Sequence, residues 1–294
     1  MTVRHAEGVL LVDKPEGPTS HDVVQAARKA LGERRVGHTG TLDPFASGLL
    51  LLCVGPWTRL VQFLTGLDKT YDAVARLGVS TDTEDREGTV LEETSAWTGV
   101  TVQAVEDALG ELRGDIVQTP PAFSAKKVGG IASHRRARRG QPVELAPQHV
   151  KVHELVLTDL DLPRVGFHVR CSSGTYVRSL ARDLGRALGV GAHLVGLRRT
   201  AVGSVSVSRA LPAARLDHAA RVEGVWMSPL EALAHLPRVE LSSAEVAAVR
   251  HGRPVPAVGG GPTGPAAATF GDRLVAVGEV TGTLFRPRKV FADG

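Results

Sequence analysis

Residues 35–50 read RVGHTGTLDPFASGLL, a polar stretch rich in glycine and threonine that runs directly into apolar sequence. The polar part has no helical or strand periodicity, whereas Leu49 to Val54 is typical of a buried strand. Loops held against a rigid scaffold often carry functional groups, so His38 and Asp43 are candidates. Both also have ordinary structural interpretations, because Asp followed by Pro is a common turn signature and a lone loop histidine usually has its hydrogen bonds satisfied locally.

The sequence on either side of this loop predicts a body of mixed strands and helices. Upstream, Gly8 to Val12 reads as a short buried strand, and Ser20 is expected to cap a helix that stops at Gly32. Downstream, the spacing of apolar residues predicts strands over 71–79 and 165–171 and helices over 101–112 and 175–188. Because these elements show neither the regular spacing of parallel βαβ units nor an internal repeat, the expected fold class is α+β.

The composition changes near Leu236. Nine of the fourteen residues from Gly252 to Pro265 are glycine or proline, and short strand-like segments such as Arg273 to Val277 flank them. This pattern predicts a small β-rich domain at the C-terminal end of the chain.

Composition also argues against several classes of protein. The two cysteines, Cys53 and Cys171, lie far apart with no C-x-x-C pair, so we expect neither a disulfide framework nor a zinc site. The longest apolar run is the six residues Leu49 to Val54, against roughly 20 for a membrane helix, and the N-terminus has no hydrophobic export segment. We therefore expect a protein of a reducing compartment that is neither inserted in a membrane nor secreted.

Positive charge is concentrated in one segment, although 35 lysines and arginines against 31 acidic residues give a net charge of only +4. No acidic residue occurs between Asp115 and Glu144, where six basic residues fall within fourteen positions: Lys126, Lys127, Arg135, Arg136, Arg138 and Arg139. Such a cluster favours binding to the phosphates of nucleic acid, although a solvated charged surface is the other interpretation. A second basic set is weaker as a patch because Asp183 lies within it. It comprises Arg170, Arg178, Arg182, Arg186, Arg198 and Arg199.

Seven sequence motifs occur in order over about 190 residues. They are DKPEGPTS (13–20), GHTGTLDPFASGLL (37–50), KTYDA (69–73), TDTEDREG (81–88), PPAFSAKK (120–127), SSGTYVRSLARDLG (172–185) and GLRRTAVG (196–203). Together they resemble the bacterial TruB-type tRNA pseudouridine-55 synthases. The resemblance implies a catalytic domain with a cleft across a central mixed, mainly antiparallel sheet. It also implies isomerisation of one T-loop uridine of tRNA to pseudouridine, with no cofactor and no metal.

The resemblance further implies roles for individual residues. Asp43 matches the nucleophile of the GTLDP motif, and Arg178 matches the arginine that pairs with it. An adjacent guanidinium is expected to lower the pKa of that carboxyl by about 1–3 units and to hold it with a planar fork. Tyr71 matches the ring that stacks on the target uracil, while Tyr176 and Leu197 match residues that line its pocket.

RNA binding is implied for three other parts of the chain. His38 matches the residue that stacks in the place left in the T-loop when the uridine flips out. The segment at about 124–150 corresponds to an insertion that grips tRNA, and here His134 stands where the family usually has a tyrosine. LSSAEVAAVRHGRPV (241–255) resembles part of a PUA domain. We therefore expect a catalytic domain over 1–235 and a PUA-like RNA-binding domain over 236–294, in a cytoplasmic monomer that binds the T-arm of tRNA without a membrane or an obligatory protein partner.

Other functions fit parts of the pattern. A non-catalytic tRNA-binding or tRNA-folding chaperone would keep the basic surface, although replacement of Asp43 would then be expected, and a related synthase could act on another RNA. A nucleotide-binding phosphotransferase is disfavoured because G-x-x-x-x-G-K-[ST] is absent, and a serine hydrolase because G-x-S-x-G is absent. The order of bond-making steps at Asp43, through C1′, through C6 or through a glycal, stays open.

Overall fold

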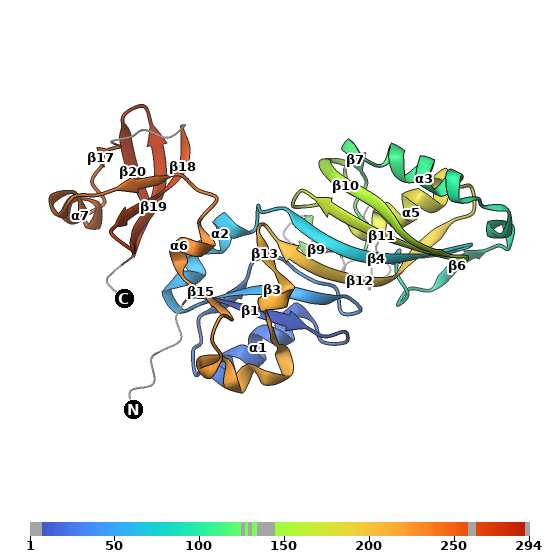
Figure 1. Cartoon of the computed structure of the whole chain (residues 1–294), viewed down its shortest axis with the longest axis horizontal. Helices are drawn as coiled ribbons and strands as arrows, with labels where there is room; N and C mark the ends of the chain where they lie inside the picture. Colours follow the sequence, from blue (N-terminus) through green and yellow to red (C-terminus); the bar gives the residue numbers. More distant parts are fainter. Residues whose placement is uncertain (1–7, 125–126, 129–130, 134–144, 258–262, 292–294) are drawn as a thin grey trace.

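The computed structural model describes residues 8–124, 127–128, 131–133, 145–257 and 263–291. A long central sheet runs through the molecule, and a smaller sheet lies at the C-terminal end (Figure 1). Within the described ranges, no helix combines the length and the apolar character needed to cross a membrane.

The central sheet is mixed and mainly antiparallel, as expected. Its strands in the described part of the chain are β1 (Gly8–Lys14), β2 (Val36–His38), β3 (Ser47–Val54), β4 (Lys69–Leu77), β7 (Gly114–Gln118), β10 (Gln148–Asp161), β11 (Arg164–Cys171), β12 (Ala192–Val202), β13 (Val205–Ser206), β14 (Leu211–Pro212) and β15 (Trp226–Met227). The main path runs β14-β1-β3-β12-β4-β11-β10-β7. β1 pairs in parallel with β14, and β3 with β12, whereas β1–β3, β12–β4 and β4–β11 are antiparallel.

Helices pack on this sheet, and the buried residues form separate hydrophobic clusters. They are α1 (Ser20–Leu31), α2 (Val61–Leu64), α3 (Val102–Glu111), α5 (Val177–Ala187) and α6 (Pro229–Ala232), with 3-10 turns η1 (Gly55–Leu60), η2 (Ala96–Gly99), η3 (Val207–Arg209) and η4 (Ala213–Arg221). Figure 1 shows α3 and α5 over the half of the sheet that contains β4, β10 and β11. In the other half, β1 alternates, so that Leu10 and Val12 pack with α1 while Val9 and Leu11 pack with Trp57 on the opposite face.

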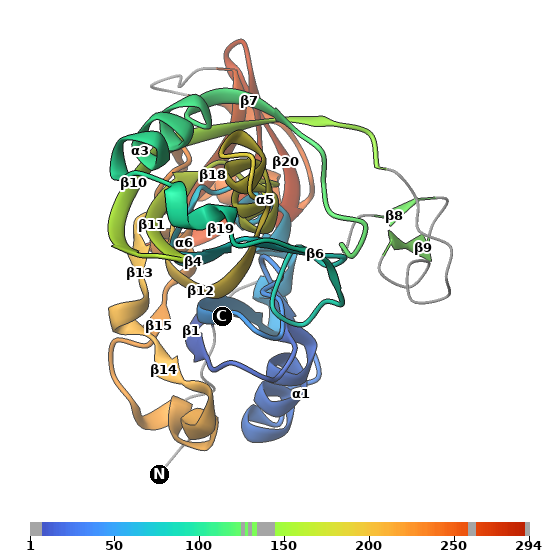
Figure 2. The same ribbon diagram turned by 90° about the vertical axis from the view of Figure 1, so that its right-hand side faces the viewer.

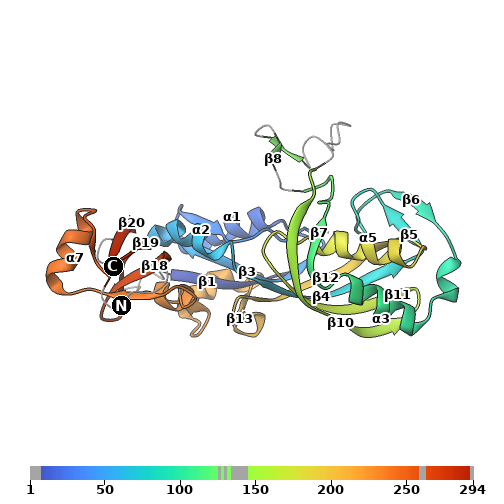
Figure 3. The same cartoon turned by 90° about the horizontal axis from the view of Figure 1, so that it is seen from above.

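Two small hairpins extend from the body. β5 (Val79–Thr81) pairs with β6 (Val90–Glu93), and β8 (Lys127–Val128) pairs with β9 (Ile131–Ala132). The β8–β9 hairpin lies in the sequence between β7 and β10, and it stands to one side of the central sheet (Figure 2, Figure 3).

The C-terminal end is β-rich, as the composition predicts. It comprises β16 (Arg238–Glu240), α7 (Ser243–Arg250), β17 (Val255–Pro256), β18 (Gly264–Phe270), β19 (Arg273–Thr281) and β20 (Leu284–Val290), with strand order β16-β18-β19-β20-β17. The rings of Trp57 and Phe291 stack with centroids 5.0 Å apart, and Arg59 donates a hydrogen bond to the Val290 carbonyl at 2.6 Å. These contacts join the small sheet to the body.

Local details differ from the sequence expectations at three places. The strand expected over 71–79 is interrupted at Gly78, whose φ of +83° separates β4 from β5. Thr19, not Ser20, caps α1, because the Thr19 side chain accepts the Asp22 amide and the Asp22 carboxylate accepts the Thr19 amide in return. Ser20 is instead buried. The polar loop also contains β2, which pairs with β3 and whose three residues are too few to show a strand period.

Candidate active site

The loop that carries Asp43 is fixed on both sides of that residue. Ser20, in the first turn of α1, accepts a hydrogen bond from the Leu42 amide at 2.8 Å and donates one to the Leu42 carbonyl at 3.0 Å. Lys14, at the end of β1, is fully buried and its ammonium donates to the Pro44 carbonyl at 3.3 Å. Because both neighbours of Asp43 are held, the position of its backbone is determined by the scaffold.

Arg199 on β12 holds the rest of the same loop. Its side chain is almost fully buried and donates to the carbonyls of Leu49 at 2.7 Å, Gly40 at 3.1 Å and Thr41 at 3.4 Å. At the end of the loop, the start of β3 pairs so closely with β12 that a Cβ at Gly48 would lie 2.2 Å from the Arg199 carbonyl oxygen. Gly48 also has a φ of +107°, so a residue without a side chain is required there.

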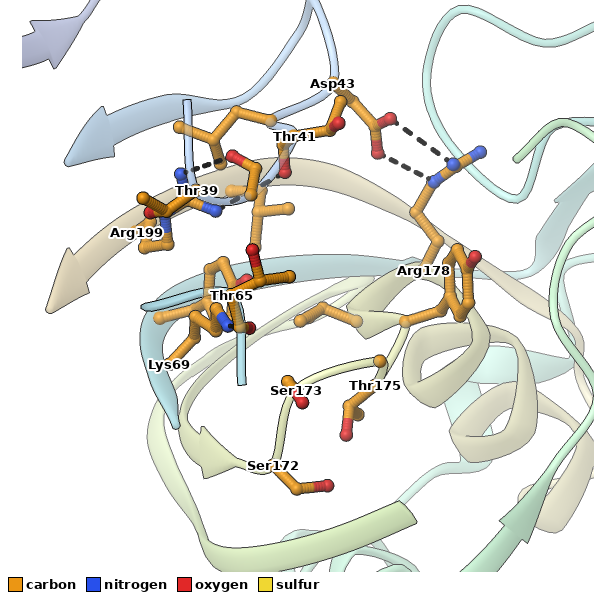
Figure 4. Close-up of a pocket in the computed structure, with 17 residues that line it drawn as sticks. Thr39, Thr41, Asp43, Thr65, Lys69, Ser172, Ser173, Thr175, Arg178 and Arg199 are labelled. Atoms are coloured by element: carbon orange, nitrogen blue, oxygen red, sulfur yellow. Dashed lines mark hydrogen bonds and ion pairs between the residues drawn. The ribbon is translucent and has the colours of Figure 1, made fainter. Parts of the chain in front are cut away.

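Asp43 faces Arg178 of α5, as the sequence predicts (Figure 4). The guanidinium meets the carboxylate through Nε to Oδ2 at 3.0 Å and Nη2 to Oδ1 at 3.4 Å. Arg178 also donates to the carbonyls of Thr83 at 2.8 Å and Phe123 at 2.9 Å, and its Nη1 lies 3.3 Å from Oδ2 of Asp85. The arginine side chain is only 5% exposed, whereas that of Asp43 is 33% exposed. The carboxylate is therefore oriented by a buried fork while it remains accessible.

The electrostatic balance at Asp43 differs from the sequence expectation. Burial raises the pKa of the Asp43 carboxyl above its ordinary value of 3.8, Arg178 opposes that rise and Asp85 adds to it. The predicted lowering of this pKa was wrong, because it counted the guanidinium and not the removal of water from the loop. Arg178 offsets part of the penalty of burying the carboxylate and fixes its orientation.

A cavity of about 430 Å³ opens beside the ion pair, within the usual range for small-ligand sites. Tyr71 on β4, Leu197 on β12 and Tyr176, just before α5, line it together with Asp43 and Arg178. The resemblance to TruB-type synthases predicts one pocket for these three residues, and the structure brings them together. Further polar lining residues seen in Figure 4 are Thr65, Lys69, Ser172, Ser173 and Thr175.

Tyr71 and His38 are both uncharged near neutral pH. Burial raises the pKa of the Tyr71 hydroxyl above its ordinary value of 10.0, although Arg199 acts in the opposite direction. Burial also lowers the pKa of the His38 ring below 6.5, and Arg199 adds to this effect. His38 ends β2 and lines a second cavity, of about 600 Å³, that shares Asp43 and Arg178 with the first. A neutral ring in that position suits stacking better than charge-based contact.

Two family models match the chain. Residues 28–177 match the N-terminal domain of the TruB family pseudouridylate synthases, and residues 178–232 match the C-terminal domain of tRNA pseudouridylate synthase B. The chain belongs to the TruB family.

Curated relatives and solved structures are similar to this chain over almost its whole length. A tRNA pseudouridine synthase B from Azoarcus sp. (strain BH72) is 43% identical over 98% of this chain and 96% of the relative. One from Thermobifida fusca (strain YX) is 46% identical over 98% of this chain and 99% of the relative. A chain of a Cbf5-Nop10-Gar1 complex aligns with a TM-score of 0.78 at 29% identity, covering 99% of this chain and 88% of that one. A chain of an H/ACA RNP bound to a substrate RNA containing 2′-deoxyuridine aligns with a TM-score of 0.74 at 28% identity, covering 98% and 86%.

The basic residues of this TruB-family chain divide into two groups. Of the insertion cluster, Lys126, Arg135, Arg136, Arg138 and Arg139, like His134, lie outside the described residues, and Lys127 is described only as backbone in β8. Several members of the second basic set are paired with acids. Arg182 contacts Glu84 and Asp183, and Arg198 contacts Asp13 at 2.8 Å. Arg199, in contrast, is bonded to backbone carbonyls, so most of the second set takes part in ion pairs or in holding the loop.

Two residues that support the TruB-family site are not among the residues predicted from the sequence. Asp85 is buried, accepts the Thr83 hydroxyl at 2.6 Å and contacts Arg178, but nothing in the acidic motif at 81–88 distinguishes it from its neighbours. Lys14 could have been noticed as a charged residue that ends an apolar strand, one residue after Asp13. Within the described ranges, no three histidine, cysteine or acidic residues cluster as a metal site requires.

Proposed function

We propose that this protein isomerises uridine 55, in the T-loop of tRNA, to pseudouridine. The observation that carries the proposal is the Asp43–Arg178 pair at the edge of a cavity of about 430 Å³, in a chain of the TruB family. Its relatives are tRNA pseudouridine synthases B, which supports tRNA as the substrate.

Asp43 is the residue that acts on the nucleoside. It drives cleavage of the bond between N1 of uracil and C1′ of the ribose, and the freed uracil turns within the cavity. C5 then joins C1′, C5 loses its proton, and N1, now free of C1′, takes up a proton, which restores the conjugated ring. The product is an isomer of the substrate, so no atom is gained or lost and the reaction needs no external oxidant or reductant. Arg178 keeps the carboxylate oriented through these steps.

The remaining lining residues hold the base. The ring of Tyr71 stacks on the uracil, and Tyr176 and Leu197 close the pocket around it. The target nucleotide must leave the stack of the T-loop to enter, which costs a few kcal/mol. His38, on the second cavity beside Asp43, stacks in the space left behind and recovers part of that energy.

RNA outside the pocket is bound by two further regions in this proposal. The basic residues of the insertion at about 124–150 contact the phosphate backbone of the T-arm. The C-terminal sheet belongs to a PUA-like RNA-binding domain over 236–294, and residues 1–235 form the catalytic domain. The protein acts in the cytoplasm as a monomer, without a protein partner.

A mapping experiment tests the proposed function. The protein is incubated with an unmodified tRNA transcript, and pseudouridine is mapped by chemical labelling and primer extension. Signal confined to the T-loop uridine supports the proposal, and signal at another position assigns a different substrate. If no pseudouridine forms while tRNA binds and refolds faster, the protein is a chaperone.

A further inference from the structure

A pair of glutamines anchors the segment that carries Tyr176. Gln118, the last residue of β7, is fully buried, and its Oε1 accepts a hydrogen bond from the Tyr176 amide at 2.7 Å. Its Nε2 donates to the carbonyl of the same tyrosine at 3.0 Å. Gln148, the first residue of β10, lies directly opposite Gln118 in the sheet and donates to the Gly174 carbonyl at 2.6 Å. Both glutamines therefore hold the segment 174–176, which lines the cavity beside Asp43.

The side-chain amide of Gln118 is complementary to the backbone of Tyr176. One primary amide offers an acceptor and donors in a plane, and here it satisfies both backbone groups of a single residue as a neighbouring strand would. Tyr176 has extended backbone angles, φ −99° and ψ 109°, just before the first turn of α5. The Tyr176 side chain makes no cap hydrogen bond there, and the Tyr176 carbonyl also accepts the Leu180 amide at 3.2 Å. The amide of Gln118 adds a restraint on Tyr176 from the side of β7.

The same stretch of chain also reaches α5 directly. Just after Gln118, the Thr119 carbonyl accepts the Ser179 hydroxyl at 3.2 Å, and the Phe123 carbonyl accepts Arg178 at 2.9 Å. The end of β7 is thus bonded to the residue before α5 and to the helix itself. Among these groups of the β7 side, only the Gln118 amide belongs to a side chain, so a substitution can remove it while the backbone carbonyls of Thr119 and Phe123 remain.

We propose that Gln118 is a positioning residue, whose side-chain amide sets the place of the Tyr176 ring in the wall of the cavity. Gln148 supports the same segment at Gly174. The effect on catalysis rests on the proposed isomerase activity, because a uracil that turns within the cavity needs a wall of fixed shape. A displacement of about 1 Å in such a site can lower a rate on the order of 100-fold.

Fluorine NMR tests the placement without relying on activity. The chain has two tyrosines, Tyr71 and Tyr176, so protein labelled with 3-fluorotyrosine gives two resonances, which Tyr71→Phe assigns. Gln118→Met keeps the length of the side chain and removes both hydrogen bonds. We expect it to shift or broaden the Tyr176 resonance and to leave that of Tyr71 in place. The matched control is Gln103→Met on α3, where an exposed amide donates to Asp107 at 2.9 Å, and it should move neither resonance.

Kinetics on the same proteins tests the consequence. In single-turnover assays with a tRNA transcript, Gln118→Met should lower the rate by about 10–100-fold while Kd for tRNA changes by less than about 3-fold. In a Tyr176→Ala background the same substitution should have little further effect on the rate, because the ring whose position the Gln118 amide sets is then absent. A structural role alone would lower the melting temperature and leave the rate per folded molecule unchanged.

The outcomes are distinguishable. A folded Gln118→Met variant with an unmoved Tyr176 resonance, an unchanged rate, or an effect that is additive with Tyr176→Ala overturns the proposal. If Gln118→Met does not fold, Gln148→Met, at a half-buried position, is measured in its place and should shift the same resonance. If the wild-type protein makes no pseudouridine, the proposed function fails, and the resonance of Tyr176 still decides whether Gln118 places the ring.

Discussion

Replacement of Arg178 by lysine separates the charge of this side chain from its geometry. The guanidinium bonds both oxygens of Asp43 and the carbonyls of Thr83 and Phe123, and it also contacts Asp85. Lysine retains the positive charge but replaces the planar fork with one ammonium group, which cannot reach all of these partners. Asp43 would then lose the group that fixes its direction.

The expected magnitude follows from the bonds that are lost. Hydrogen bonds to a charged group contribute about 1.5–3 kcal/mol each, so loss of two of them predicts a decrease of about 3–6 kcal/mol in the free energy of unfolding. Misplacement of the carboxylate by about 1 Å predicts a further fall in single-turnover rate on the order of 100-fold, measured per folded molecule. Urea denaturation gives the first quantity, and tritium release from uridine labelled at C5 gives the second.

Arg186→Lys is the matched control. Arg186 lies two turns further along α5, its side chain is 75% exposed, and its contact with Asp183 is 3.8 Å long. The control should change stability by less than about 0.5 kcal/mol and leave the rate unchanged. If Arg178→Lys behaves like the control, the guanidinium fork does not hold Asp43, and the reasoning about the site is refuted.

Three other predictions concern the protonation of Asp43, the hydroxyl of Tyr71 and the charge of the insertion. Because burial raises the pKa of Asp43 and the reaction uses the ionised carboxylate, the single-turnover rate should fall with decreasing pH through a midpoint above 3.8, and a midpoint at or below 3.8 would contradict this. Tyr71→Phe should bind tRNA normally and lose about 10-fold or more in rate if the hydroxyl assists removal of the C5 proton, a role that unchanged turnover would rule out. Changing Arg135, Arg136, Arg138 and Arg139 to glutamine should lower the slope of log Kd against log salt concentration by up to about four units, whereas an unchanged slope would show that they do not contact phosphates.

Much of the fold could be predicted from local pattern. The alternation of Val165 to Cys171 gave β11, and helical spacing gave α1, α3 and α5, because each of these elements buries one face at its own period. β2 and the cap at Thr19 were not predicted, since three residues show no period and either of two adjacent hydroxyls could have capped the helix. Such details are decided by pairing with β3 and by the burial of Ser20.

The grouping of the candidate residues around one cavity was predictable, but the electrostatic balance at Asp43 was not. The resemblance of the motifs predicted that Asp43, Arg178 and Tyr71 lie at one pocket, and in the structure all three line the same cavity. The direction of the pKa shift at Asp43 was wrong, because burial depends on how residues 39–46 pack against β12 and α1. The contributions of Asp85 and Gln118 come from segments distant in sequence, and no spacing along the chain indicates them.

Replacement of Asp43 by asparagine tests the central claim most directly. Since burial raises the pKa of this carboxyl, its ionised form does not stabilise the folded protein at pH 7, and Arg178 retains Asp85 as a partner in the variant. We therefore expect Asp43→Asn to fold and to bind tRNA with a Kd within about 3-fold of the wild-type value. Pseudouridine at the T-loop uridine, measured by tritium release in a single turnover, should be absent. Product formation by this variant at a rate near that of the wild type would contradict the account.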